Sequence, residues 1–224
     1  MLRAIIFDCD GVIADTEPLH LAMFQRVLEQ EGIELTREEY YGKYLALDDR
    51  SCFTTIHRDR GVPISREKLA RLIEQKADFL EPVMRDRLHI FPGVVEFIRE
   101  AWLRYPIAVA SGALRHEVEL VLHHAGVRTC FQVIVAAEDV VMGKPDPEPF
   151  LNACAQLSAS QVESFGPHEC LVIEDSMPGV RAAHLAGMRC LAVTNSYPED
   201  RLVDADRVVH SLAGLAPQEL EDLF

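Results

Sequence analysis

The chain has 224 residues, of which 49% are hydrophobic, enough to bury a sizeable core in one large domain or two unequal ones. Its formal net charge of −14 and pI near 5.0 disfavour nonspecific binding to nucleic acid or to an anionic membrane, because the summed field of the protein would repel phosphate groups. An anionic ligand must therefore be bound by local groups.

The first predicted element is a buried strand at residues 4–7, and two aspartates follow it. The run is continuously apolar, as in a strand that is covered on both faces. Asp8 and Asp10 come next, with Gly11 directly after them. Two carboxylates at one sheet edge need a cation or a proton between them, and oxygen ligands suit Mg²⁺. We therefore predict a magnesium site that a phosphorylated substrate completes.

Residues 16–87 are predicted to form an all-helical domain inserted after the first strand. Apolar residues recur there at helical spacing, and no β-branched run comparable to the first strand occurs. The remaining residues, 1–15 and 88–224, are expected to form a catalytic core domain.

Five further short apolar runs predict the other strands of that core. They are residues 106–110, 133–136, 170–173, 190–193 and 207–209. Helix-like stretches separate most of them, such as 115–125, where Gly126 is placed to end the helix. Strands that alternate with helices predict an α/β fold with a Rossmann-like, doubly wound parallel sheet. Residues 213–224 predict a short final helix.

Ligands of an open parallel sheet bind outside the carboxyl ends of its strands, so the residues at those ends are candidates for the site. Four strand exits carry chemically active groups: Asp8 and Asp10, then Ser111 and Gly112, then Lys144 in the loop after the third strand, then Glu174 and Asp175. Phosphoryl transfer needs positive charge, an in-line nucleophile and a proton donor for the leaving oxygen. These side chains could supply all three.

Each side chain at these exits has a predicted role. Asp8 lies closest to the rigid strand and is the predicted nucleophile, which would form an acyl phosphate. Asp10 is the predicted general acid and base. Lys144 would pair with Asp8 and a phosphate oxygen, while the Ser111 hydroxyl would bind a second phosphate oxygen. Asp175 would complete the metal shell, with Glu174 as either a ligand or an orienting group.

Together these motifs resemble those of the haloacid dehalogenase superfamily. The resemblance is carried, in this order, by Asp8-Cys9-Asp10-Gly11-Val12, Ser111, Lys144-Pro145-Asp146-Pro147 and Glu174-Asp175-Ser176. It implies a Rossmann-like core, a small mobile cap domain in the helical insertion, and an aspartyl-phosphate mechanism with Mg²⁺, in which the backbone carbonyl of Asp10 also binds the metal. Members that cleave halides or phosphonates lack an acid matching Asp10, so its presence implies phosphate-ester chemistry.

Within that superfamily the chain is similar to the β-phosphoglucomutase-like group of phosphatases and mutases. The similarity lies in Asp15-Thr16, His20, and the glycine and alanine pattern at 179–183 and 186–187. The substrate-binding residues that it implies are Thr16, His20, Arg50, Lys76, Gly112 and Arg115. Two of these residues also have a purely structural interpretation. Thr16 could be only a helix N-cap, and Lys76 could lie on a solvated helix face.

Two departures favour a phosphatase over a mutase. Ala46 stands near where the mutase pattern has glycine, and Gly112 to Arg115 replace a segment with lysine and asparagine. A mutase must also return the phosphoryl group before water attacks it. We predict a phosphatase that acts on a small phosphorylated metabolite, a sugar or polyol phosphate. The alternatives are a sugar phosphomutase and a non-catalytic phosphate-binding module, although such a module should have lost a catalytic strand exit.

The cysteines and the apolar runs indicate the compartment. The six cysteines show no C-x-x-C spacing, and no apolar run approaches the roughly 20 residues that span a bilayer. The chain also begins directly with a strand-like run instead of a cleavable apolar segment. We expect a cytoplasmic protein with reduced thiols, a monomer or weak homo-oligomer, that has no nucleic-acid or membrane partner.

Overall fold

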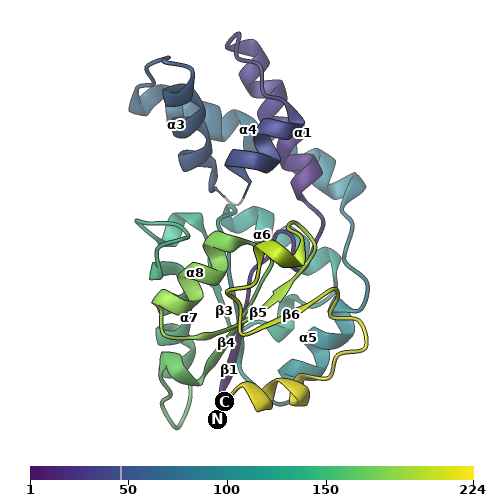
Figure 1. Ribbon diagram of the computed structural model, residues 1–224. Coiled ribbons are helices and arrows are strands. Elements are labelled where there is room, and N and C mark those ends of the chain that lie inside the picture. The colour runs from purple at the N-terminus through teal and green to yellow at the C-terminus, as the bar shows by residue number, and fades with distance from the viewer. Residues whose placement is uncertain (46) are drawn as a thin grey trace. The chain divides into compact units, whose positions relative to one another are not determined.

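The computed structural model describes residues 1–45 and 47–224, which form two compact units. The first consists of Met1–Asp15 and Ile90–Phe224 and is called the sheet unit here. The second consists of Thr16–His89 and is called the helical unit. Figure 1 shows the strands of the sheet unit as arrows and the helices of both units as coiled ribbons.

The sheet unit contains a six-stranded parallel sheet in the order β3-β2-β1-β4-β5-β6. The strands are β1 (Ala4–Phe7), β2 (Ile107–Ala110), β3 (Val133–Val135), β4 (Cys170–Glu174), β5 (Arg189–Val193) and β6 (Arg207–Val209). β1 therefore lies in the middle, between β2 and β4. After β3 the chain returns to the middle of the sheet as β4, so the strand order reverses between β1 and β4, where doubly wound folds bind their ligands. The predicted α/β fold is confirmed.

Helices connect the strands of the sheet unit. They are α5 (Val94–Trp102), α6 (Arg115–His124), α7 (Glu148–Ala159) and α8 (Met177–Leu185). Short 3-10 helices span Arg128–Cys130, Ala137–Asp139, Pro167–Glu169, Glu199–Arg201 and Pro217–Leu223. The last of these takes the place of the predicted final helix. No helix within the described residues is both long and apolar enough to cross a membrane.

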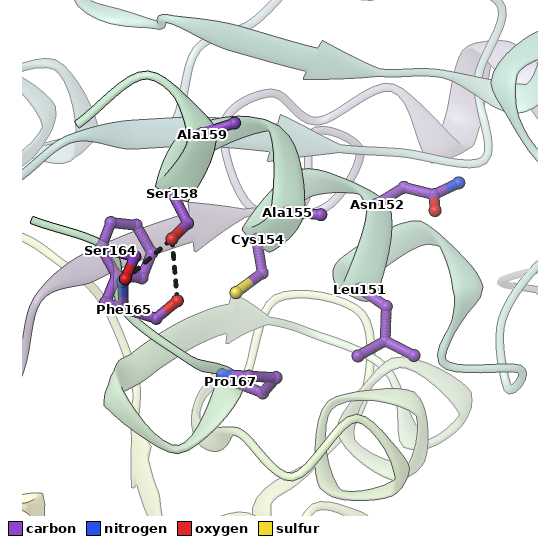
Figure 2. A pocket seen from close by; sticks show the side chains of 9 residues that line it. All are labelled: Leu151, Asn152, Cys154, Ala155, Ser158, Ala159, Ser164, Phe165 and Pro167. Atoms are coloured by element: carbon purple, nitrogen blue, oxygen red, sulfur yellow. Dashed lines mark hydrogen bonds between the residues drawn. The ribbon is translucent and has the colours of Figure 1, made fainter. Parts of the chain in front are cut away.

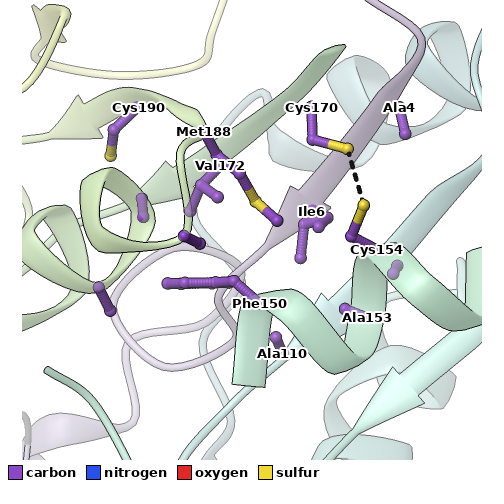
Figure 3. Close-up of a cluster of buried hydrophobic side chains, with 14 of the residues drawn as sticks. Ala4, Ile6, Ala110, Phe150, Ala153, Cys154, Cys170, Val172, Met188 and Cys190 are labelled. Atoms are coloured by element: carbon purple, nitrogen blue, oxygen red, sulfur yellow. Dashed lines mark hydrogen bonds between the residues drawn. The ribbon is translucent and has the colours of Figure 1, made fainter. Parts of the chain in front are cut away.

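The alternating side chains of β1 show why the sheet is buried on both faces. Ile6 points into an apolar cluster that includes Phe150 of α7 and Val172 of β4 (Figure 3). Phe7 points to the opposite face, where its ring meets those of Phe97 in α5 and Phe131 at 6.1 and 5.7 Å. A strand that alternates between two apolar layers has no polar face, which explains its continuous apolar sequence.

The helical unit contains no strand among its described residues. Its elements are α1 (Glu17–Gln30), α2 (Arg37–Glu39), a π-helix (Tyr40–Tyr44), α3 (Asp49–Asp59) and α4 (Arg66–Arg87). Side-chain caps set where two of these begin: Asp48 accepts a hydrogen bond from the backbone N–H of Ser51, and Ser65 accepts one from Lys68. The rings of Phe24 and Phe53 pack edge to face in its core.

Candidate active site

The strand register brings the exits of β1 and β4 together. Phe7 pairs with Ile173, so the next residues along each strand, Asp8 and Glu174, are neighbours at the carboxyl edge. The backbone N–H of Asp8 donates to the carbonyl of Ile173 at 2.9 Å, which extends the ladder into the exit. The register of two parallel strands therefore sets the spacing of these carboxylates.

Lys144 links the two acidic exits. Its Nζ lies 2.9 Å from Asp8 Oδ1 and 2.6 Å from Glu174 Oε1, and its side chain is only 7% exposed. The loop that carries it is anchored where α7 begins, because Glu148 accepts hydrogen bonds from the backbone N–H groups of Val141 and Met142. A sequence-distant lysine is thus bound between two strand-end carboxylates.

Glu174 is fixed by the start of α8. Its Oε2 accepts hydrogen bonds from the backbone N–H of Asp175 and from both the backbone N–H and the hydroxyl of Ser176, at 2.9–3.0 Å. A methyl group on Gly179 would come within 1.9 Å of this carboxyl group, so only glycine fits there. These contacts leave Oε1 for Lys144 and for any cation beside it.

Three carboxylates of this edge form a candidate metal site. Asp8, Glu174 and Asp175 are buried, and each offers an oxygen atom within 4.8 Å of the others. The turn after β1 approaches this group at Gly11, which has a φ of 75°. A methyl group on Gly11 would lie 1.8 Å from Asp175 Oδ2. An all-oxygen, anionic donor set fits a hard cation such as Mg²⁺.

The protonation of the site follows from burial and from close opposite charges. Burial raises the pKa of Asp8 well above its ordinary value, and the Lys144 ammonium opposes this shift. Burial would lower the pKa of Lys144, but the carboxylates of Asp8 and Glu174 raise it above its ordinary value. Burial would likewise raise the pKa of Glu174, but Lys144 and the hydrogen-bond donors lower it. Lys144 is therefore an ammonium and Glu174 a carboxylate.

Asp10 and Ser111 meet at the same edge. The Ser111 hydroxyl donates to Asp10 Oδ2 at 3.3 Å and accepts a hydrogen bond from the backbone N–H of Ala113 at 3.0 Å. Asp10 is half-buried, Ser111 is buried, and Gly112 is exposed. Sequence reasoning assigned these residues to separate exits of β1 and β2, and the structure brings the two side chains into contact.

Arg115 has partners other than the carboxylate cluster. It stands at the start of α6, where its guanidinium pairs with Asp139 and donates to the carbonyl of Ile134 at 3.0 Å. Its backbone N–H donates to the carboxylate of Glu138. Substrate binding by Arg115 stays a prediction, and it would require the guanidinium to exchange Asp139 for a phosphate group.

Four predicted substrate residues lie in the helical unit. Thr16 is buried and precedes α1, while Arg50 is exposed on the first turn of α3. Lys76 is fully buried, and its Nζ lies 2.5 Å from Asp49 Oδ1 and 2.9 Å from His20 Nδ1. The interpretation of Lys76 as part of a solvated helix face is therefore wrong. Substrate binding by these residues stays a prediction, and Ala46 lies outside the described residues.

One residue beside the cluster was not foreseen from the sequence. Asn195 follows β5, and its side-chain amide donates to the carbonyl of Gly11 at 2.7 Å. It thereby ties the turn after β1 to the exit of the fifth strand. A signal existed, because Thr194, Asn195 and Ser196 are polar and directly follow an apolar run in the same way as the other exits.

The protein is thus a doubly wound α/β protein in which acidic residues at the strand ends and one lysine form a single buried cluster. Residues 5–193 match the family model described as haloacid dehalogenase-like hydrolase. The chain belongs to this family, which confirms both the resemblance and the prediction of a hydrolase.

Several relatives match most of the chain. It is 33% identical over 224 residues to "Putative phosphatase YhcW" of Bacillus subtilis, covering 98% of this chain and 95% of the relative. It is 30% identical to "Phosphorylated carbohydrates phosphatase" of Thermotoga maritima, covering 98% and 96%. It is also 30% identical to "Bifunctional riboflavin kinase/FMN phosphatase" of Arabidopsis thaliana, of which it spans only 53%.

The fold is shared with a solved β-phosphoglucomutase from Clostridium difficile. That structure matches with a TM-score of 0.87 and covers 100% of this chain and 97% of its own. The sequence identity is 24%, so this likeness concerns the fold.

Proposed function

We propose that this protein is a magnesium-dependent phosphatase that hydrolyses a small phosphorylated metabolite, a sugar or polyol phosphate, through a phosphoryl group carried on Asp8. The observation that carries the proposal is the position of Asp8 in the buried cluster, bonded to Lys144 and grouped with Glu174 and Asp175. Two relatives support the proposal by their names: one is a putative phosphatase, and the other is a phosphatase of phosphorylated carbohydrates.

The two oxygen atoms of Asp8 have different tasks in this proposal. Oδ1 accepts hydrogen bonds from the backbone N–H of Cys9 at 2.8 Å and from the Lys144 ammonium at 2.9 Å, which fixes the carboxylate. Oδ2 attacks the phosphorus atom, and the bond from phosphorus to the ester oxygen breaks. The Lys144 ammonium and the Ser111 hydroxyl hold oxygens of the transferring phosphoryl group.

Asp10 handles the proton in both half-reactions. In the first, it gives a proton to the ester oxygen that leaves as an alcohol. In the second, the resulting carboxylate takes a proton from a water molecule, which attacks phosphorus and releases Asp8 and inorganic phosphate. Without substrate the Ser111 hydroxyl donates to Asp10. When substrate binds, this single O–H exchanges Asp10 for a phosphate oxygen.

The residues proposed to hold Mg²⁺ are Asp8, Glu174 and Asp175, with the backbone carbonyl of Asp10. Bound Mg²⁺ would supply positive charge that keeps the carboxylates ionised and offsets the charge of the phosphoryl oxygens. The substrate contacts proposed for Thr16, His20, Arg50, Lys76, Gly112 and Arg115 rest on the sequence resemblance. The proposed setting is the cytoplasm, which the six free thiols favour.

A phosphate-release assay tests the proposal directly. Sugar and polyol phosphates would be offered with and without Mg²⁺, to the native chain and to Asp8→Asn. We expect release that requires Mg²⁺ and that the substitution abolishes, with an unchanged circular dichroism spectrum. Phosphate release that Asp8→Asn retains would refute the assignment of the nucleophile.

The same assay separates the phosphatase from the phosphomutase alternative. A mutase would convert β-glucose 1-phosphate to an isomer and release little phosphate, because the phosphoryl group returns to a second hydroxyl before water reaches it. Efficient isomerisation without phosphate release would therefore replace the proposed function by the alternative.

A further inference from the structure

Two cysteines face each other in the core of the sheet unit. Cys154 lies on α7 and Cys170 is the first residue of β4, with 3.5 Å between their sulfur atoms (Figure 3). Both are buried, and the Cys170 S–H can also reach the carbonyl of Gly166 at 3.6 Å. Among the described residues this is the only cysteine pair in hydrogen-bond contact. The two thiols are thus arranged for chemistry with each other.

The pair lies at the opposite end of the sheet from the candidate active site. In the register of β1 and β4, Cys170 pairs with Ala4, whereas Glu174 follows Ile173, the partner of Phe7. Glu174 lies four positions along the strand from Cys170, roughly 13 Å at about 3.3 Å per residue. The proposed phosphatase chemistry therefore makes no use of these thiols.

A surface groove reaches one thiol of the pair. The groove has a volume of about 630 Å³, and Cys154 lines it together with Ala155, Ser158, Phe165 and Pro167 (Figure 2). Ser158 holds its wall in place, because its hydroxyl both donates to the carbonyl of Phe165 and accepts from its backbone N–H, each at 2.9 Å. Cys170 is not part of the lining. A small reagent that enters the groove would meet Cys154 first.

The contact between the sulfurs also makes them unequal. The hydrogen bond from Cys170 lowers the pKa of Cys154, against the effect of burial. The same hydrogen bond raises the pKa of Cys170, and burial adds to this. Because the thiolate is the form that attacks an oxidant, this direction agrees with the groove, which gives a reagent access to Cys154 and not to Cys170.

We propose that Cys154 and Cys170 form a peroxide-modifiable dithiol, in which Cys154 reacts first and Cys170 then closes a disulfide bond. The Cys154 thiolate attacks one oxygen of hydrogen peroxide and the O–O bond breaks, which gives a sulfenic acid and hydroxide; the hydroxide becomes water with the proton that the Cys154 thiol released. The Cys170 sulfur then attacks the Cys154 sulfur, and the sulfenic hydroxyl leaves as a second water with the Cys170 proton. Two thiols lose two electrons and one peroxide gains them. The sulfurs must approach from 3.5 Å to about 2.05 Å.

Peroxide treatment of the reduced native protein tests this proposal. Free thiols would be counted and peptides mapped by mass spectrometry. We expect two thiols per chain to be lost, a crosslink between the peptides containing Cys154 and Cys170, and full recovery with dithiothreitol. Cys130→Ala, which removes another buried cysteine, should keep the crosslink. Cys170→Ala should stop at a Cys154 sulfenic acid that dimedone traps.

Three results would overturn the proposal. The crosslink could join other cysteines, Cys154 could advance to sulfinic acid while Cys170 stays reduced, or both thiols could persist under a peroxide dose that consumes free glutathione. The readout is the covalent state of the native chain and does not involve phosphate release. Its outcome is therefore independent of the proposed function.

Discussion

The sheet unit and the helical unit each enclose a lysine ammonium, and they balance its charge differently. Lys144 meets the carboxylates of Asp8 and Glu174, while Lys76 meets Asp49 and the ring of His20. With Asp175 included, the sheet unit groups three buried carboxylates, two of which contact the Lys144 ammonium. The first cluster has more carboxylates than ammonium groups and so retains negative charge for a further cation, whereas the second places the Asp49 carboxylate beside Lys76. A buried lysine alone therefore does not indicate a metal site, whereas an excess of buried carboxylates around it does.

The largest expected effect comes from Lys144→Met. The substitution removes the cation beside Asp8, leaves the buried carboxylates to repel one another, and raises the pKa of Asp8 further. We expect kcat for a sugar phosphate to fall about a thousandfold, as when one charge-stabilising donor is removed. The measurement is steady-state phosphate release, with circular dichroism to verify folding. A fall of less than about tenfold would show that Lys144 is structural.

Lys76→Met should lower the stability of the protein, in addition to any loss of the proposed substrate contact. The Lys76 side chain is 0% exposed, so its loss leaves Asp49 as a partly buried carboxylate without its ammonium. We expect a loss of about 3 kcal/mol in the free energy of unfolding, measured by urea denaturation.

The double variant Lys76→Met with Asp49→Leu sharpens this result. It removes both charges and should recover most of the lost stability, because apolar replacements of a buried pair are often nearly neutral. If the double variant is no more stable than Lys76→Met alone, the ion pair is not what holds these helices.

Gly11→Ala tests the close approach of the β1 turn to the carboxylates. Gly11 and Gly187 share a left-handed φ, 75° and 76°, but only at Gly11 does an added methyl group meet a side chain, Asp175. Both alanine variants should lose about 1 kcal/mol from backbone strain. Only Gly11→Ala should also require about tenfold more Mg²⁺ for half-maximal phosphate release. An equal Mg²⁺ requirement in both variants would contradict the metal assignment for Asp175.

The active-site residues at the strand ends could be predicted because their positions follow from local sequence patterns and from a general rule for parallel sheets. A continuous apolar run identifies a buried strand, and the residue after it is at the carboxyl edge of a parallel sheet. Asp8, Ser111 and Glu174 follow such runs directly. The sequence could not show that Lys144 touches both Asp8 and Glu174, because the distances depend on how a long loop folds back.

The burial of Lys76 was missed for a different physical reason. Helical periodicity shows which residues share a face, and Lys76 lies four residues from both Leu72 and Leu80, which are buried. A lysine on this buried face of the helix can be buried only if an acidic residue elsewhere in the fold pairs with it. That residue is Asp49, which is 27 residues away in the sequence and so could not be identified from the helix alone. Likewise, the contact from Asn195 to Gly11 spans 184 residues. Pairings of this range are set by tertiary packing and have no local signature.

The smallest expected effect concerns an ion pair within the helical unit and its dependence on pH. The hydrogen bond from Arg60, supported by the backbone N–H of Thr36, lowers the pKa of Glu39 from its ordinary value of 4.5. A depressed carboxyl pKa contributes stability that is present above the unfolded value and is lost as the pH falls through the folded value. The free energy of unfolding, measured by urea denaturation, should fall between about pH 6 and about pH 3, and in Glu39→Gln this fall should be smaller by about 0.5 kcal/mol. That magnitude is typical of a partly exposed ion pair. Glu38→Gln removes the same charge from an exposed neighbour, so an equal reduction there would trace the effect to net charge instead of the pair with Arg60.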